Sequence, residues 1–112
     1  MKTTLPILNK VVQCADGFTM SVQASQYSYS LPRVDFADEY THAEVGMPNK
    51  KEELLMPYIA GFGSVYPTTT VYPYVPRQLI TNVIAKHGGM IGGELPAGFP
   101  YLYAPGAKKH PS

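Results

Sequence analysis

The histidines of this sequence are its strongest candidates for metal ligands. His42 and Glu44 lie two positions apart, so on a β-strand their side chains share one face, and His87 ends a predicted helix. Imidazole and carboxylate groups bind divalent metals, so the three could form a site if the helix end met the strand. Nothing in the sequence places His87 near His42. We therefore predict no metal site, and interpret His42 and Glu44 as a solvent-facing pair and His87 as a helix C-cap.

Cys14 is the single cysteine and the one candidate for a thiol nucleophile. His42 as a base, with Asp16 or Asp35 to orient it, would complete a catalytic triad. A catalytic thiol needs a lowered pKa, and Cys14 has neither a basic neighbour nor a helix N-terminus beside it. We predict that Cys14 is a small buried hydrophobic residue, that the chain is not an enzyme and that it needs no cofactor.

Tyrosine is in clear excess, with nine residues in a chain of 112 that has no tryptophan. Tyrosine offers a large contact area at a low conformational cost, which suits a binding surface. Equally, the tyrosines could fill a small core in place of tryptophan and phenylalanine. The acidic stretch after Arg33 is interpreted as a solvated surface that could also face a basic partner. We predict a partner-binding patch formed by Tyr27, Tyr29, Arg33, Asp35, Asp38 and Tyr40.

Composition narrows the class of partner. Nine Lys and Arg balance eight Asp and Glu to a net charge of +1, which argues against nucleic acid as a partner. The apolar runs are far shorter than the roughly 20 residues that span a bilayer, and the N-terminus does not have the pattern of a signal peptide. A lone cysteine excludes an internal disulfide and fits a reducing compartment. We expect a cytoplasmic protein with no membrane segment.

Strand patterns dominate the first half of the chain. Apolar and polar residues alternate over residues 18–25, which predicts a strand with one buried face. Residues 8–14 predict a second strand, joined to the first by a turn at 15–17 that contains an Asp and a Gly. Residues 40–45 predict a third strand, with Tyr40 on the same face as His42. A short fourth strand at 68–72 could pair with the hairpin.

Two segments have helical patterns. Residues 77–87 follow Pro76, carry one apolar stripe and stop at Gly88-Gly89, which predicts a well-defined helix. Residues 50–59 predict a short helix with Asn49 as its N-cap, limited by Pro57.

The elements together predict a small α+β fold. It has an antiparallel sheet of three or four strands, one well-defined helix, one short helix and long connections rich in the 11 Pro and 10 Gly residues. We predict a single domain over residues 1–90. Residues 91–112 predict an extended aromatic, Pro- and Gly-rich tail, ordered only if its aromatic side chains pack into a groove.

Several segments resemble small proteins encoded by tailed bacteriophages. They are the run from Cys14 to Ser25, Pro32-Arg33, the pattern Tyr40-Thr41-x-x-Glu44-Val45-Gly46-x-Pro48, the run from Thr70 to Pro76, and the run from Ile84 to Gly89. Together they cover about half of the chain. The group has no assigned activity, so the resemblance transfers no site residue. It implies a compact accessory protein made in the cytoplasm of an infected bacterial host cell, where proteins of this size are often inhibitors, anti-CRISPR proteins among them.

The leading hypothesis is a non-catalytic binding protein of phage origin that sterically inhibits a host defence or regulatory protein. One alternative is a virion or assembly subunit that forms a homo-oligomer through its aromatic tail. The other is a small hydrolase, metal-dependent or cysteine-dependent, that uses His42, His87 or Cys14.

Overall fold

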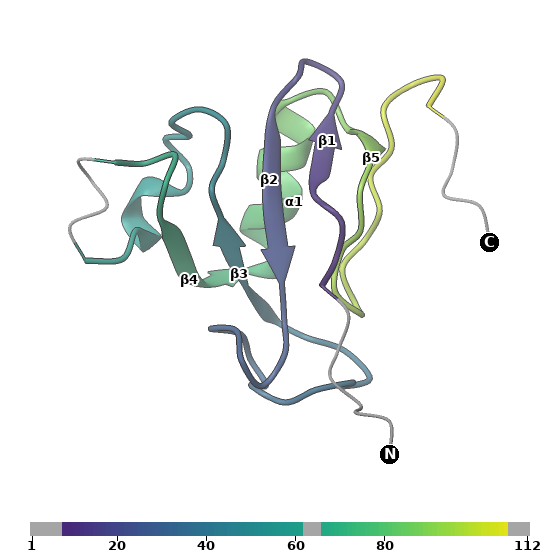
Figure 1. Cartoon of the computed structure of the whole chain (residues 1–112). Helices are drawn as coiled ribbons and strands as arrows, with labels where there is room; N and C mark the ends of the chain where they lie inside the picture. The colour runs from purple at the N-terminus through teal and green to yellow at the C-terminus, as the bar shows by residue number, and fades with distance from the viewer. Residues whose placement is uncertain (1–7, 62–65, 108–112) are drawn as a thin grey trace.

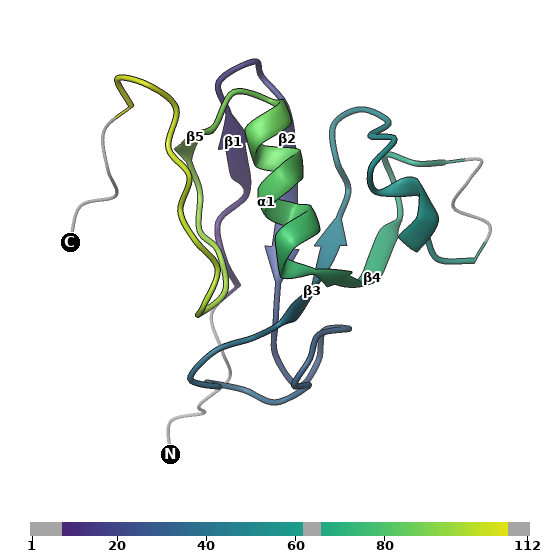
Figure 2. The same cartoon turned by 180° about the vertical axis from the view of Figure 1, so that it is seen from behind.

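The computed structural model describes residues 8–61 and 66–107. Within these residues, one antiparallel sheet of five strands has a single α-helix on one face and no helix on the other (Figures 1 and 2). The elements in chain order are β1 (Val12–Cys14), β2 (Thr19–Gln23), β3 (His42–Gly46), the 3-10 helix η1 (Met56–Tyr58), β4 (Val71–Pro76), α1 (Arg77–Lys86) and β5 (Met90–Gly92). The strand order in the sheet is β4-β3-β2-β1-β5. The α+β class and the antiparallel sheet are thus confirmed.

The core lies between the sheet and α1. In β2, Met20 and Val22 are buried while their neighbours are partly exposed, as the alternation predicts. The register pairs Val12 with Met20, and Val22 with Val45, so apolar residues of neighbouring strands face the helix together. The helix contributes an apolar stripe of Ile80, Val83 and Ile84 to the same core.

Helix α1 begins and ends where the sequence predicts. Pro76 precedes its first residue, and His87 is its C-cap. Gly88 and Gly89 follow with φ of 90°, a conformation that residues with a Cβ rarely adopt. A Cβ on Gly89 would lie 2.6 Å from the Ala104 nitrogen, so the chain can pass here only because this residue is glycine.

The number of strands exceeds the predicted three or four. The additional strand, β5, has only three residues in a glycine-rich run, which is too short to show an alternation in the sequence. It pairs with β1 through an irregular register. The fourth predicted strand is displaced: β4 covers Val71–Pro76 and pairs with β3, not with the hairpin. As an edge strand it tolerates Pro73, whose missing N–H would break a central ladder.

The prediction of a short helix over residues 50–59 is wrong in its extent. Only the three residues of η1 are helical, and Asn49 caps no helix. The Asn49 side chain accepts a hydrogen bond from the Thr19 N–H and donates one to the Gly17 carbonyl, so it fastens this segment to the start of β2. Asparagine competes for backbone groups in this way at turns, which is also why it favours helix caps.

The segment after β5 folds back onto the sheet. The Met90 N–H donates to the Leu102 carbonyl and the Ala104 N–H donates to the Met90 carbonyl, so residues 102–104 lie beside β5. Leu95 and Phe99 are buried in the core. β5 begins at residue 90, where the predicted domain ends. The predicted tail thus contributes buried residues to the core, and it pairs with β5 at residues 102–104.

Candidate functional site

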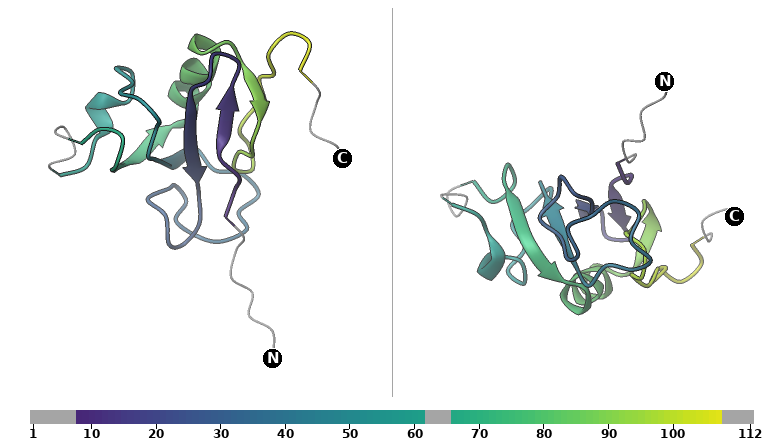
Figure 3. Two further views of the ribbon diagram at one scale, coloured as in Figure 1. Left: turned by 45° about the horizontal axis from the view of Figure 1, so that its top comes forward. Right: turned by 90° about the horizontal axis from the view of Figure 1, so that it is seen from below.

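The connection between β2 and β3 carries an unusual concentration of exposed apolar side chains. It forms one end of the molecule, at the bottom of Figure 1 and in front in the view from below in Figure 3. Tyr27 is 64% exposed and Phe36 is 73% exposed. Tyr74 of the edge strand β4 lies beside this loop. We call the whole set the aromatic loop surface: Tyr27, Tyr29, Leu31, Arg33, Val34, Phe36 and Tyr74.

The four aromatic rings supply most of the apolar area of this surface. A fully exposed aromatic side chain presents about 200 Å², and the four rings are on average about half exposed. Together they therefore expose roughly 400 Å². The largest apolar patch on a typical monomer has an area of about 300–600 Å² and is often functional. A typical protein interface takes about 800 Å² from each partner, so these rings alone could supply half of one.

Ring contacts connect the loop to the sheet edge. The Tyr29 and Tyr74 rings are 5.7 Å apart between centroids, and the Arg33 guanidinium lies 4.8 Å from the centroid of Tyr29. The Tyr74 N–H donates to the Tyr29 carbonyl. Arg33 thus stacks on an aromatic face in a cation–π contact, and Tyr29 is held between a cation and a strand.

A buried tyrosine shapes the turn at residues 34–37. The Tyr40 hydroxyl donates to the Val34 carbonyl at 2.7 Å and accepts from the Ala37 N–H at 3.2 Å, so it bridges the two ends of the turn. Tyr40 is 4% exposed. Its predicted place in the binding patch is therefore wrong: it lies before β3 begins, so the strand alternation does not govern it, and its ring enters the core.

The two predicted acidic residues of the patch differ. Both oxygens of Asp35 accept hydrogen bonds from Gln26, one from its backbone N–H at 2.9 Å and one from its side chain at 2.7 Å. Asp35 therefore ties the turn to Gln26 on the outer side of the loop, whereas Tyr40 bonds the turn from the core side. Asp38 is exposed, and within residues 8–61 and 66–107 no hydrogen bond or ion pair is recorded for it.

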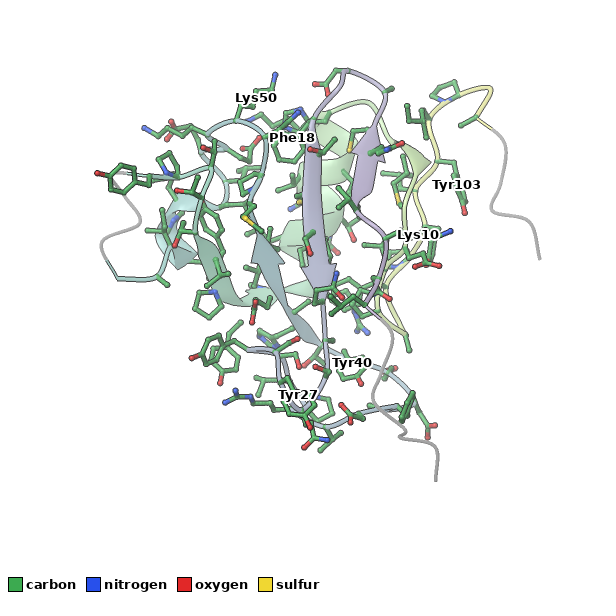
Figure 4. The ribbon with its side chains drawn as sticks, in the orientation of Figure 1. Lys10, Phe18, Tyr27, Tyr40, Lys50 and Tyr103 are labelled. Carbon is green, nitrogen blue, oxygen red and sulfur yellow. The ribbon has the colours of Figure 1, made fainter. Side chains whose placement is uncertain are left out.

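The base of the loop is tied to both sides of the molecule. The Glu44 carboxylate accepts from the Tyr29 N–H. The Tyr40 N–H donates to the Ala97 carbonyl, and the Arg77 side chain donates to the carbonyls of Tyr40 and Gly98. The loop is thus fixed by β3, by α1 and by the segment after β5. Figure 4 shows Tyr27 and Tyr40 at this end of the molecule and Phe18 and Lys50 at the other.

A polar cluster lies at that other end, around His87. One ring nitrogen of His87 is 2.6 Å from Asp16 and the other is 2.6 Å from Glu52, while the ring stacks on Phe18 at 4.1 Å. Ionised carboxylates only accept hydrogen bonds, so both ring nitrogens of His87 are engaged by carboxylate oxygens. Glu52 also accepts from Lys86 at 2.7 Å.

Hydrogen bonds keep both carboxyl groups of the His87 cluster ionised. The Phe18 N–H, and after it His87, hold the pKa of Asp16 below its ordinary value. Burial alone would raise the pKa of Glu52, but the bonds from Lys86, the Leu54 N–H and His87 outweigh it and lower this pKa. With both of its nitrogens engaged, His87 has no lone pair to offer to a metal or to a substrate proton.

The residues considered for catalysis are not assembled. Cys14 is buried, and burial, with Asp16 adding to it, raises the pKa of its thiol to about 11, so it lacks the thiolate that a nucleophile needs. His42 bonds to its neighbour Thr41. Among residues 8–61 and 66–107, no group of three His, Cys, Asp or Glu side chains is placed to hold a metal ion.

Sequence reasoning missed Glu52 of the His87 cluster, and it missed Phe36 together with Leu31, Val34 and Tyr74 of the aromatic loop surface. Glu52 lies in a run of charged residues that is typical of a solvated surface, and its partners are 34 and 35 residues away. Phe36 lies between Asp35 and Ala37 in a polar stretch, where a large apolar residue in a loop was the available signal.

Comparison with protein-family models, curated proteins and solved structures gives no match. No helix within the described part of the chain has the length and the apolar character needed to cross a membrane.

Proposed function

We propose that this chain is a non-catalytic binding protein that acts by covering part of a partner protein with its aromatic loop surface. The observation that carries the proposal is the exposure of three aromatic rings on a loop whose backbone is held by hydrogen bonds, together with the exposed ring of Tyr74 on the neighbouring edge strand. Protein interfaces are enriched in tyrosine, phenylalanine and arginine, the residue types that gather here. Because the loop is already ordered, little conformational entropy is lost when it binds.

Charge indicates the kind of surface that the partner presents. The loop between β2 and β3 contains one cation, Arg33, and three carboxylates, Asp35, Asp38 and Glu39. Arg33 is stacked on Tyr29, and Asp38 is without a partner in the described residues. An aromatic surface with an acidic rim favours a basic protein face and disfavours the phosphates of nucleic acid.

The resemblance to small phage proteins supplies a biological context for this proposal. In an infected bacterium, the partner would be a host defence or regulatory protein, and binding would inhibit it by steric exclusion. No reaction on the partner is needed for such inhibition, which agrees with a protein whose His87 and Cys14 are both engaged or buried.

Affinity capture from bacterial lysate tests the proposal, followed by titration of the recovered partner in purified form. Tyr27→Ala removes an exposed ring from the surface, and we expect it to abolish recovery of a partner that the natural chain captures. Tyr66→Ala is the matched control, because Tyr66 is equally exposed (66%) and lies outside the aromatic loop surface. Equal recovery with both variants would contradict the proposal.

A further inference from the structure

Phe36 occupies a backbone conformation that does not suit it. Its φ is 55°, in the left-handed region where a Cβ crowds the following carbonyl. Glycine and asparagine adopt this conformation more readily than phenylalanine. A strained residue is usually compensated by packing, but the Phe36 ring is 73% exposed. Neither the turn nor the core explains why this position holds an aromatic residue.

The turn that presents Phe36 is rigid. Tyr40 bridges its two ends from the core side, and Asp35 is held on its outer side by two bonds from Gln26. The backbone of the turn therefore already presents the ring to solvent before any partner arrives. Anchor residues of protein interfaces are large rings of this kind, which fill a pocket on the partner and carry much of the binding energy.

Charge selects one occupant for this surface. Asp38 follows Phe36 by two residues, is exposed and has no partner among the described residues. A second copy of this chain would bring its own acidic rim against the first in a two-fold contact, which like charges disfavour. A partner with a lysine or arginine beside an apolar pocket would satisfy both the ring and the carboxylate.

We infer that Phe36 is the anchor of the interface, and that it enters an apolar pocket on the partner whose rim carries a lysine or arginine that pairs with Asp38. This inference rests on the proposed function and adds to it the chemistry of the partner's site.

Stability gives the first test, and it requires no partner. Phe36→Asn relieves the strain without loss of packing, so we expect its urea unfolding midpoint to equal or exceed that of the natural chain. Met47→Asn is the matched control, because Met47 has φ of 44° and 63% exposure at the opposite end of β3. A clear drop in the midpoint for Phe36→Asn alone would overturn the inference, since the ring would then be a packing residue.

Selection of short random peptides on the full chain gives the second test. We expect the enriched peptides to combine a large apolar side chain with lysine or arginine, and to bind Phe36→Asn at least tenfold more weakly than Met47→Asn. Asp38→Lys should shift the enrichment towards Asp and Glu. Enriched peptides without basic residues would overturn the inferred pocket, as would a dimer in sedimentation equilibrium that Phe36→Asn abolishes.

The two proposals fail in distinguishable ways. If Tyr27→Ala abolishes capture of the partner but Phe36→Asn does not, Phe36 is not the anchor and the proposed function stands. If neither substitution changes capture, the aromatic loop surface is not the binding surface and both proposals fail.

Discussion

Removal of a single oxygen from Tyr40 should loosen the turn that presents Phe36. Tyr40→Phe keeps the ring in the core and deletes the hydroxyl that donates to the Val34 carbonyl and accepts from the Ala37 N–H. A hydrogen bond contributes about 1 kcal/mol net, and a buried polar group left without a partner costs about 1–3 kcal/mol. Val34 is half exposed, so water can reach the freed carbonyl.

We therefore expect the free energy of unfolding to fall by about 1–2 kcal/mol. For a chain of this length that corresponds to a decrease in Tm of roughly 5–10 °C. Urea unfolding measures the stability, and amide hydrogen exchange measures the turn directly. The Ala37 amide should exchange at least tenfold faster in the variant, because the hydroxyl that accepts its hydrogen bond is gone.

Tyr72→Phe is the control for this experiment. Tyr72 is also buried, and its hydroxyl donates to the Pro67 carbonyl at 2.6 Å, far from the turn in the sequence and on another strand. Tyr72→Phe should lower the free energy of unfolding by a similar amount and should leave the exchange rate of the Ala37 amide unchanged. If Tyr40→Phe leaves that exchange at the natural rate, the hydroxyl does not shape the turn and the reasoning on Phe36 loses its support.

Three further predictions concern the rest of the molecule. Glu52→Gln should lower stability by about 2 kcal/mol, because an amide cannot accept all the bonds of the carboxylate; no change would contradict the geometry of the His87 cluster. Since the pKa of Glu52 is lowered in the folded state, its contribution to stability is complete above the ordinary value of 4.5 and is lost as the pH falls below it. The urea midpoint should therefore drop as the pH falls below 4.5, and less steeply in Glu52→Gln. Cys14 should react with iodoacetamide at pH 8 roughly a hundredfold more slowly in the folded chain than in urea, as expected for a thiol pKa of about 11, and equal rates would show that it is accessible. Gly93→Ala should lower the free energy of unfolding by more than about 2 kcal/mol, because the new Cβ would lie 2.4 Å from a backbone oxygen. Gly17→Ala, with open space around it, should lower it by about 1 kcal/mol. Similar losses in the two variants would refute the steric argument.

Local patterns in the sequence predict the elements that depend on neighbours in the chain. The alternation in β2, the turn after Cys14 and the stripe of α1 are all visible within about ten residues, and they are present in the structure. β5 was missed because three residues are too few to show an alternation, and its pairing with β1 depends on residues far away in the sequence.

The sites depend on contacts that no spacing reveals. His87 was predicted correctly as a helix C-cap, yet its partners Asp16 and Glu52 are 71 and 35 residues away. Tyr40 was assigned to the binding patch because it lies, with Tyr27, Tyr29 and Arg33, around the loop that interrupts the sheet, and position in a loop does not reveal which rings turn into the core. Tyr27 and Tyr29 are exposed, and their role in binding a partner stays a prediction.

The anchoring of the aromatic loop by residues 97 and 98 has a consequence for how the protein matures during synthesis. The loop leaves the ribosome long before Ala97 and Gly98, whose carbonyls fix its base through Tyr40 and Arg77. Until those residues emerge, a nascent chain can form the hairpin but cannot hold the loop in its final shape. Under the proposed function, recognition of a target should therefore begin only after translation has passed the last strand.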